Sequence, residues 1–220
     1  MKKIIRIKLG LSLGFLTVFA LWTIAVSLVD VQTIGPENAC VGFATLNGFI
    51  SRLIGVNWIL YILTDWLALI PLVFMLGFAI LGLVQWIRRK SLSKVDSSIL
   101  ALGGFYIVVI AAYVFFEFCV VNYRPVLING IMEASYPSST TLLVLTVMPT
   151  ACMQFNMRIN SYVAKRHIHF AIVAFTVFMV VGRLLSGVHW MTDIIGGALL
   201  SAGLVMLYDS IMTYIQQRIR

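Results

Sequence analysis

Charged residues are scarce in this chain of 220 residues. Asp, Glu, Lys and Arg together make up 11% of it, whereas soluble domains average about 25%, and hydrophobic residues make up 61%. So few charged side chains cannot cover an apolar core of this size with a charged surface. The composition therefore excludes an ordinary soluble domain and indicates a membrane protein.

Cysteine and histidine are also scarce, and neither is grouped as metal ligands usually are. Three cysteines, Cys40, Cys119 and Cys152, lack any metal-ligand or redox spacing, and an odd number defines no disulfide framework. His167 and His169 stand in a basic segment without a neighbouring Cys or carboxylate. We therefore expect neither a metal site nor a cofactor.

Long hydrophobic runs, by contrast, recur along the whole chain. About 20 mostly apolar residues are enough for a helix to cross a bilayer. Runs that pass this test cover residues 9–29, 66–87, 99–121, 137–153, 168–187 and 190–208. The sequence predicts an all-α fold, an integral membrane bundle of six transmembrane helices that forms a single membrane domain over residues 1–220.

Positive charge gathers at the same end of alternate runs. The formal net charge is +8, and only Arg52, Arg124 and Arg183 lie outside four basic clusters. The clusters are Lys2, Lys3, Arg6, Lys8; Arg88, Arg89, Lys90, Lys94; Arg158, Lys165, Arg166; and Arg218, Arg220. Because Lys and Arg concentrate on the cytoplasmic side of membrane helices, we predict a multi-pass protein of the cell membrane with both termini cytoplasmic. This charge sets orientation and contacts anionic membrane lipids, so we expect no nucleic-acid partner. The oligomeric state stays open.

The longest connection, residues 30–65, lies on the outer side in this topology. Its apolar residues recur with a helical period, which predicts an amphipathic helical segment at the membrane interface. They are Phe43, Leu46, Phe49, Ile50 and Leu53. Thr64 and Asp65 just before the second run suggest a helix start, and we interpret Asp65 as the helix cap.

Three charged residues interrupt the hydrophobic runs near their outer ends. They are Glu117, Arg183 and Asp193. Each charge costs about 2.5–3.5 kcal/mol on membrane insertion, so such residues are functional candidates by default. The predicted topology brings them to one side of the membrane, together with the polar residues of two outer loops.

The chemistry that these residues suggest is phosphoryl transfer. Arg124 and Arg183 come from different helix ends, and a guanidinium presents a planar fork of donors that matches phosphate oxygens. His189 and Asp193 are four residues apart and share one helix face. The carboxylate would hold the imidazole in one tautomer and leave its other nitrogen free to attack phosphorus.

A run of hydroxyl residues offers a further phosphate contact. Pro137 suits the first turn of a helix. Ser138, Ser139 and Thr140 would then present hydroxyl and backbone N–H groups at a helix N-terminus, where the helix dipole favours an anion. The sequence predicts an anion-binding cup there.

The chain resembles the membrane-bound type 2 phosphatidic acid phosphatase (PAP2) family over about residues 99–208. That family's pattern is a Lys, six residues and Arg-Pro; then Pro-Ser-Gly-His; then Ser-Arg, five residues, His, three residues and Asp. The matching positions are Arg124-Pro125, Pro137-Ser138, Arg183, His189 and Asp193. The resemblance implies that His189 is a nucleophile that forms a phosphohistidine and that Asp193 orients it. It also implies that Arg124, Arg183 and Ser138 bind the phosphate of a lipid.

Three positions depart from that pattern. Glu117 stands in place of the Lys, Ser139-Thr140 in place of Gly-His, and Gly182 in place of the Ser before the second arginine. The first change replaces a cation with an anion. The second removes the residue that the resemblance implies as the general acid, and general acids are typically worth about 10²–10⁴-fold in rate.

Three hypotheses follow from these departures. Glu117 replaces the missing acid, since a carboxyl group in an apolar setting keeps its proton more readily. Alternatively, the substrate is a diphosphate lipid, whose phosphate leaving group needs less protonation. The third is a non-catalytic protein that binds or transports lipid phosphates. We favour a lipid phosphate or diphosphate phosphatase at the outer leaflet, for which the resemblance implies isoprenoid diphosphate or phosphatidylglycerol phosphate as substrate.

Overall fold

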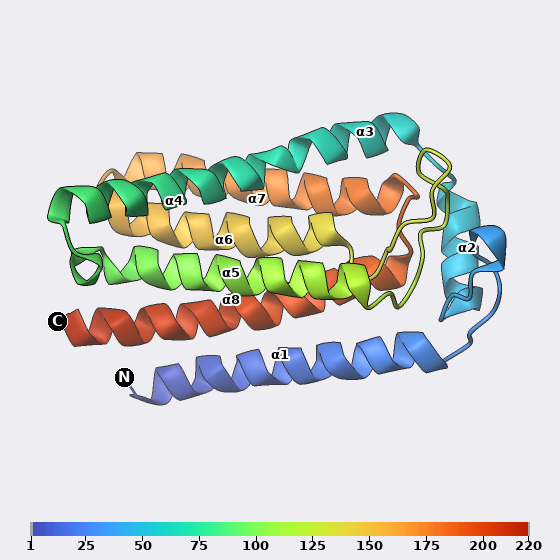
Figure 1. The fold of residues 1–220 in the computed structure, drawn as a ribbon, viewed down its shortest axis with the longest axis horizontal. Coiled ribbons are helices and arrows are strands. Elements are labelled where there is room, and N and C mark those ends of the chain that lie inside the picture. Colours follow the sequence, from blue (N-terminus) through green and yellow to red (C-terminus); the bar gives the residue numbers. More distant parts are fainter. Residues whose placement is uncertain (1, 220) are drawn as a thin grey trace.

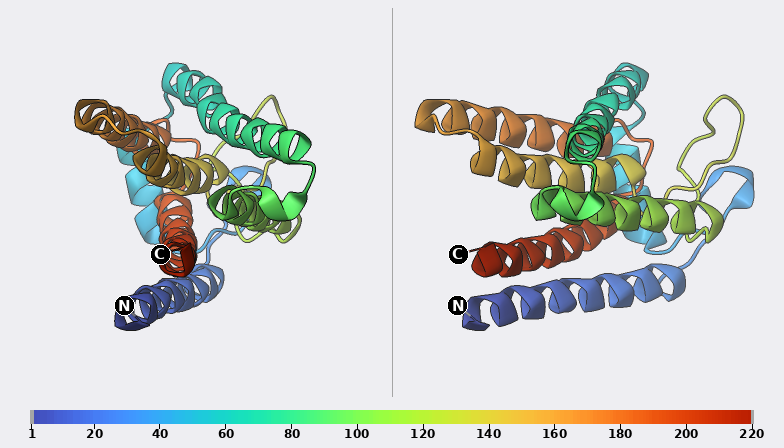
Figure 2. Two further views of the ribbon diagram at one scale, coloured as in Figure 1. Left: turned by 90° about the vertical axis from the view of Figure 1, so that its left-hand side faces the viewer. Right: turned by 60° about the vertical axis from the view of Figure 1, so that its left-hand side comes forward.

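A computed structural model describes residues 2–219, with side chains described from residue 3 to 217, and these residues form an all-α bundle (Figure 1). In chain order the elements are α1 (Lys2–Leu28), η1 (Pro36–Asn38), α2 (Ala44–Ile54), α3 (Trp58–Leu67), α4 (Leu69–Arg89), η2 (Leu92–Lys94), α5 (Ser97–Phe118), α6 (Ser139–Arg158), α7 (Tyr162–Leu185) and α8 (Met191–Ile219). The long helices run side by side, and α2 lies across one end of the bundle (Figures 1 and 2). The start of α1 and the end of α8 lie together at the opposite end. Lys2, Arg218 and Arg220 of the basic clusters fall outside the described side chains.

Five helical stretches within the described residues are long and apolar enough to cross a membrane. They are Lys3–Leu28, Trp58–Arg89, Ser97–Phe118, Tyr162–Leu185 and Met191–Gln217. The predicted span 137–153 corresponds to α6, which is not among them because polar side chains lower its hydropathy. Those side chains, Thr140, Thr141, Thr146, Thr150 and Gln154, are all buried. Neighbouring helices rather than lipid surround the polar face of α6, and its role as a sixth span remains a prediction.

Small residues let α1 pack closely against α8. A Cβ at Gly203 would lie 2.7 Å from Leu16 Cδ2, so only glycine fits there without a shift. The Ser12 hydroxyl donates to the Gly203 carbonyl oxygen over 2.8 Å. Lys8, the last residue of the N-terminal basic cluster, pairs with Asp209 on α8 at 2.7 Å. Close backbone approach with interhelical hydrogen bonds is how helices associate where lipid surrounds them.

The segment 30–65 is more helical than the sequence predicted. A helix, α2, does occupy the stretch predicted to be amphipathic, with Asn47 buried and Phe49 and Leu53 exposed. The second span begins at Trp58, because α3 and α4 together form one long helical stretch. Asn57 caps α3 by accepting the Leu60 N–H, and Asp65 lies inside the helix, so our interpretation of Asp65 as a cap was wrong.

Candidate active site

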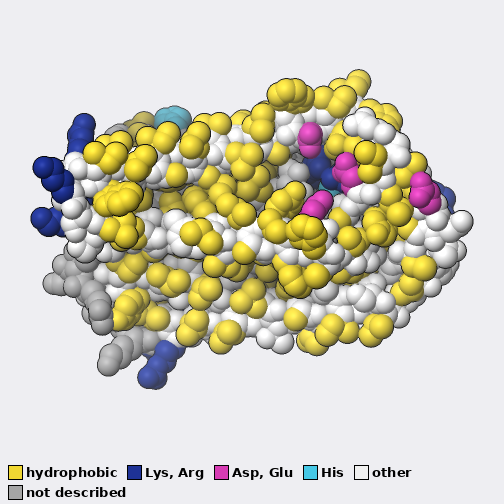
Figure 3. Space-filling view, in the orientation of Figure 1, with side chains coloured by type: hydrophobic (Ala, Val, Ile, Leu, Met, Phe, Trp, Pro, Cys, Tyr) yellow, Lys and Arg dark blue, Asp and Glu magenta, His cyan; other side chains and the backbone are white. Residues whose placement is uncertain are grey.

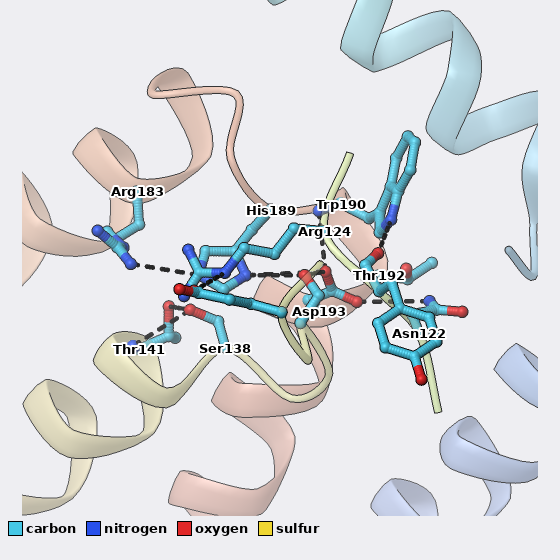
Figure 4. A network of polar contacts seen from close by, with 12 residues as sticks. Asn122, Arg124, Ser138, Thr141, Arg183, His189, Trp190, Thr192 and Asp193 are labelled. Carbon is cyan, nitrogen blue, oxygen red and sulfur yellow. Dashed lines mark hydrogen bonds and ion pairs between the residues drawn. The ribbon is translucent and has the colours of Figure 1, made fainter. Parts of the chain in front are cut away.

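Four segments meet at the end of the bundle beside α2, namely the loop 119–138, the start of α6, the end of α7 and the start of α8 (Figure 4). The loop folds back on itself. The Arg124 N–H donates to the Glu133 carbonyl oxygen over 3.1 Å, and the Ser135 N–H donates to the Asn122 carbonyl oxygen over 2.9 Å. This pairing holds Arg124 and Ser135 close together although they are eleven positions apart in the sequence.

The predicted pair His189 and Asp193 is joined through a third residue, Ser135. His189 Nδ1 lies 3.8 Å from Asp193 Oδ2, too far for a hydrogen bond, but 3.0 Å from Ser135 Oγ. The Ser135 hydroxyl donates its single proton to Asp193 Oδ2, so Oγ is free only to accept from His189 Nδ1–H. Nδ1 therefore carries the proton, and Nε2 keeps its lone pair.

Asp193 is itself held in place on the first turn of α8. Its Oδ2 accepts the Trp190 N–H over 2.9 Å, and Asn122 Nδ2 lies 3.5 Å from Oδ1. A carboxylate at a helix N-terminus is favoured by the unpaired N–H groups and by the helix dipole. Asp193 is fully buried, as is the Ser138 backbone that binds its carbonyl oxygen.

Gly187 makes the turn that delivers His189 from α7 into the site. Its φ is +70°, and a Cβ at this position would lie 1.9 Å from the Gly55 carbonyl oxygen. The turn therefore packs directly against the link between α2 and α3. The Asn57 N–H donates to the Ser186 carbonyl oxygen over 3.0 Å and reinforces the contact.

Arg183 points its guanidinium at the free nitrogen of His189 (Figure 4). Nη2 lies 3.3 Å from His189 Nε2, Nη1 lies 3.4 Å from Thr64 Oγ1, and Asp65 Oδ1 is 3.7 Å from Nη1. The guanidinium also stacks over the Tyr61 ring at 5.2 Å, a cation–π geometry. Only 1% of Arg183 is exposed, and its Nε has no hydrogen-bond partner among the described residues.

Arg124 flanks His189 from the loop side. Its Nε lies 3.1 Å from Glu133 Oε2 in an ion pair, but both Nε and Nη1 are buried without a hydrogen-bond partner among the described residues. A buried donor without a partner costs about 1–3 kcal/mol, more when charged. An anion bound between Arg124 and Arg183 would remove that cost.

Burial, together with the charges of Arg124 and Arg183, holds the pKa of His189 well below its ordinary value, and the bond to Ser135 offsets this only in part. His189 is therefore neutral at neutral pH. A neutral imidazole with Nδ1 protonated has the form required of a nucleophile at Nε2.

The start of α6 differs from the predicted anion cup in detail. Ser138 is the N-cap, so the helix begins at Ser139 and Pro137 precedes it. The Ser138 hydroxyl accepts from Thr141 Oγ1–H over 3.0 Å, and its N–H binds the Asp193 carbonyl oxygen over 3.1 Å. Ser139 faces the cavity described next, while Thr140 faces an adjoining groove. Phosphate binding by these three residues stays a prediction.

A polar cavity of about 230 Å³ opens in front of these groups. Arg124, Ser135 and Ser139 line it, and so do Glu117 and Glu133. Figure 3 shows this hollow, with acidic side chains around basic ones. A groove of about 480 Å³ adjoins it, shares Tyr113, Ser139 and Leu142 with it, and is otherwise mainly apolar. The site thus combines a polar compartment with an apolar one, as a lipid head group and chain require.

Glu117 occupies the last turn of α5, exposed to the cavity. We expected apolar residues around its carboxyl group, but on the side of the cavity there are none over it. No contact joins it to His189 among the described residues, and its catalytic role stays a prediction.

Sequence reasoning missed Ser135, Asn122 and Glu133. Ser135 directly precedes Tyr136-Pro137, and Asn122 lies two residues before Arg124, so both adjoin motifs that we had singled out. Position next to a motif was the only available signal. It did not reveal that the loop 119–138 folds back on itself.

Comparisons with known proteins identify the family of this chain. The chain matches the PAP2 superfamily over residues 72–217. It also matches the crystal structure of a transmembrane PAP2-type phosphatidylglycerolphosphate phosphatase from Bacillus subtilis with a TM-score of 0.62 and 16% identity, over 93% of this chain and 96% of that one. A search of curated proteins finds no significant match. The family match spans well over half of the chain, and with the apolar helices it shows that the chain belongs to the PAP2 superfamily and is a multi-pass membrane phosphatase by class.

Proposed function

We propose that this protein removes phosphate from a lipid phosphate or lipid diphosphate at the outer leaflet, through a phosphohistidine on His189. The main support for the proposal is the arrangement of groups around His189. His189 is neutral, its Nε2 lone pair points between two arginines with unpaired buried donors, and an apolar groove adjoins the cavity. This arrangement supplies a nucleophile, an oxyanion clamp and space for a lipid chain.

The reaction begins when His189 Nε2 attacks phosphorus and the bond from phosphorus to the leaving oxygen breaks. Arg183 exchanges its contact with Nε2 for a phosphate oxygen, and Arg124 binds another, so both charges stabilise the transition state. The imidazole becomes positive as it forms the N–P bond. The negative charge of Asp193 stabilises the imidazolium through Ser135 and two hydrogen bonds, in place of the direct contact of a His–Asp pair. Water then attacks phosphorus and the N–P bond breaks. Phosphate leaves with the protons of the water, and His189 is neutral again.

The leaving group depends on the substrate. A lipid diphosphate expels a lipid phosphate, which leaves without a proton. A monoester expels an alkoxide that must be protonated, and Glu117 in the cavity wall is the candidate acid. For either substrate the phosphate ligands are Arg124, Arg183, Ser138, Ser139 and Thr140.

The distribution of charge supports the outer location. The basic residues Arg88, Arg89 and Lys90 end α4 at the end of the bundle away from the site. Counting α6 as a sixth span places both termini on that same side. The positive-inside rule then assigns the basic end to the cytoplasm and the site to the exterior.

Phosphate release from purified protein tests the proposal. Wild type in detergent should release phosphate from at least one member of a panel of lipid mono- and diphosphates. His189→Ala should lower the rate by at least about a thousandfold, as loss of a nucleophile does. The matched control is His167→Ala, because His167 is exposed on α7 far from the site. Equal rates in wild type and His189→Ala would contradict the mechanism.

A non-catalytic lipid-phosphate binding or transport protein is the second candidate. The observation in its favour is that Thr140, in place of a histidine, faces the apolar groove and offers no acid. Binding of lipid phosphates without release from any of them would support this alternative over the enzyme.

A further inference from the structure

Acidic side chains surround the entrance to the phosphate cavity. Glu117 from α5 and Glu133 from the loop line the cavity, and Asp65 from α3 lines the adjoining groove. All three are at least partly exposed, whereas Arg124 and Arg183 are almost fully buried. The site is therefore positive on its floor and negative at its rim, as the hollow in Figure 3 shows. We call these three carboxylates the acidic rim.

The acidic rim outnumbers the two arginines below it. Glu133 pairs with Arg124 at 3.1 Å and Asp65 with Arg183 at 3.7 Å, which leaves Glu117 with no ion pair among the described residues. A phosphate group brings one or two further negative charges and draws both arginines toward itself. With an uncharged head group, the complex would hold an excess of negative charge at a low-dielectric boundary, which Coulomb repulsion opposes.

Glu117 also stands where a helix disfavours an anion. It lies in the last turn of α5, whose C-terminal carbonyl groups carry the negative end of the helix dipole. Both the carboxylate and the helix end therefore favour a cation beside them. Tyr113, one turn earlier on the same face, lines the cavity too, and an aromatic ring face attracts ammonium groups.

A second observation ties this rim to a ligand with two charges. Arg124 is 9% exposed, lines the same cavity as Glu117, and has buried Nε and Nη1 donors without hydrogen-bond partners. Arg124 can therefore bind a phosphate at the inner end of the cavity, and Glu117 can bind a cation at its outer end. Tyr113 lines the cavity with Glu117 and favours an organic ammonium group over a metal ion, because aromatic ring faces attract ammonium groups.

We propose that the preferred substrate is a lipid phosphate whose head group carries an ammonium group a few bonds from phosphorus, with Glu117 as its main determinant. This inference rests on the proposed function and specifies its substrate class. The phosphate lies between Arg124 and Arg183, the ammonium lies between Glu117 and the Tyr113 ring, and the hydrocarbon chain follows the apolar groove. Glu117 is ionised in this complex and does not also act as the general acid considered above. The ammonium beside the ester carbon gives a proton to the leaving oxygen and takes one back from solvent. The family lysine at this position would repel the same ammonium, so the departure from the family pattern is what creates the preference.

A matched pair of substrates tests the inference on the full-length protein in detergent. One is a long-chain amino alcohol phosphate with the amine on the carbon beside the phosphate ester carbon, and the other is its N-acetylated counterpart. The two differ in one positive charge. Wild type should show kcat/KM about tenfold higher for the amine, because unit charges about 4 Å apart at a protein surface attract by more than thermal energy. Glu117→Gln should lose this preference, and Glu117→Lys should reverse it.

The control variant is Glu37→Gln, which removes an exposed carboxylate at the same end of the molecule but outside the cavity. It should keep the amine preference of wild type. Equal preference in wild type and Glu117→Gln would overturn the inference and leave the phosphatase intact. Preference for an amine-free diphosphate with Mg²⁺, abolished by a chelator, would also overturn it, because the cation would then be a metal.

Binding measurements separate this inference from the proposed function. If neither lipid releases phosphate, the same pair is compared by competitive displacement of a fluorescent lipid phosphate. Tighter binding of the amine to wild type but not to Glu117→Gln would support the inference while the enzyme fails. Equal binding of the two lipids to wild type would overturn it.

Discussion

Ser135 determines how His189 and Asp193 cooperate. A hydroxyl between the imidazole and the carboxylate keeps the proton on Nδ1 and the lone pair on Nε2, although the two side chains are 3.8 Å apart. A sequence pattern with His and Asp four residues apart predicts a direct contact. The intervening hydroxyl comes from another segment of the chain.

Removing that hydroxyl should lower the rate without removing the nucleophile. In Ser135→Ala, Nδ1–H and Asp193 each lose a partner, so we expect kcat to fall by about 10–100-fold, as for other residues that orient a functional histidine. Ser135→Thr keeps the hydroxyl and should recover part of the rate. The measurement is phosphate release together with a melting curve, and unchanged kcat in Ser135→Ala would contradict the relay.

The protonation of His189 should respond to its neighbouring charges. Because burial and two arginines lower its pKa, the imidazole should stay neutral well below its ordinary value of about 6.5. Arg124→Gln removes one of these charges, so the pKa should rise and protonation should occur at higher pH. Imidazole NMR titration of the two proteins measures the shift. Identical titrations would show that Arg124 does not act on His189.

Protein stability should depend on pH through the same residue. The pKa of His189 is lower in the folded protein than in the unfolded chain, where it is about 6.5. Below that pH the unfolded state therefore binds more protons than the folded state. Its contribution to stability is therefore complete above that pH and is lost as the pH falls. The melting temperature of wild type should drop between pH 7 and pH 5 by more than that of His189→Ala.

At the scale of elements, two links hold the site together. The turn between α7 and α8 packs on the link between α2 and α3 through Gly187 and Gly55. The second link is the loop 119–138, which backbone hydrogen bonds between its two arms hold in a folded-back shape. Neither link is encoded by hydrophobic periodicity, which explains why the helices were easier to predict than the contacts between their ends.

Gly187→Ala should destabilise the protein. The added Cβ meets the Gly55 carbonyl oxygen, a backbone atom that cannot swing away, and the positive φ is itself unfavourable for alanine. We expect a loss of about 1–3 kcal/mol and reduced activity, because His189 is only two residues further on. Gly103→Ala on α5 is the control, since nothing lies within 4 Å of its added Cβ. Equal melting temperatures for the two variants would contradict this packing.

At the scale of the whole molecule, sequence analysis recovered more of the architecture than of the site. Runs of apolar residues predicted the helices. They also predicted that Arg183, His189 and Asp193 lie close together, because the end of one helix meets the start of the next. Glu133 did not follow, because its contact with Arg124 depends on the folded loop. The start of α3 at Trp58 was missed because Thr64 and Asp65 interrupt the apolar pattern inside the helix.

The orientation in the membrane can be tested on native cysteines. Cys40 and Cys119 are exposed near the site, and Cys152 is buried. In intact cells a membrane-impermeant maleimide should label Cys40. With all native cysteines replaced, a Ser93→Cys variant, exposed in the basic connection between α4 and α5, should stay unlabelled until the membrane is permeabilised. The opposite pattern would place the site in the cytoplasm.

The buried polar face of α6 has a consequence for biogenesis. A segment with four buried threonines and a buried glutamine has too little hydropathy to partition from the translocon into lipid by itself. As the sixth span that we predict, α6 would enter the bilayer together with a neighbour, most simply as a helical hairpin with α7, from which only Ile159–Asn160–Ser161 separates it. A nascent chain truncated at Arg158 should therefore leave α6 outside the membrane, whereas one extended through α7 should insert both helices at once.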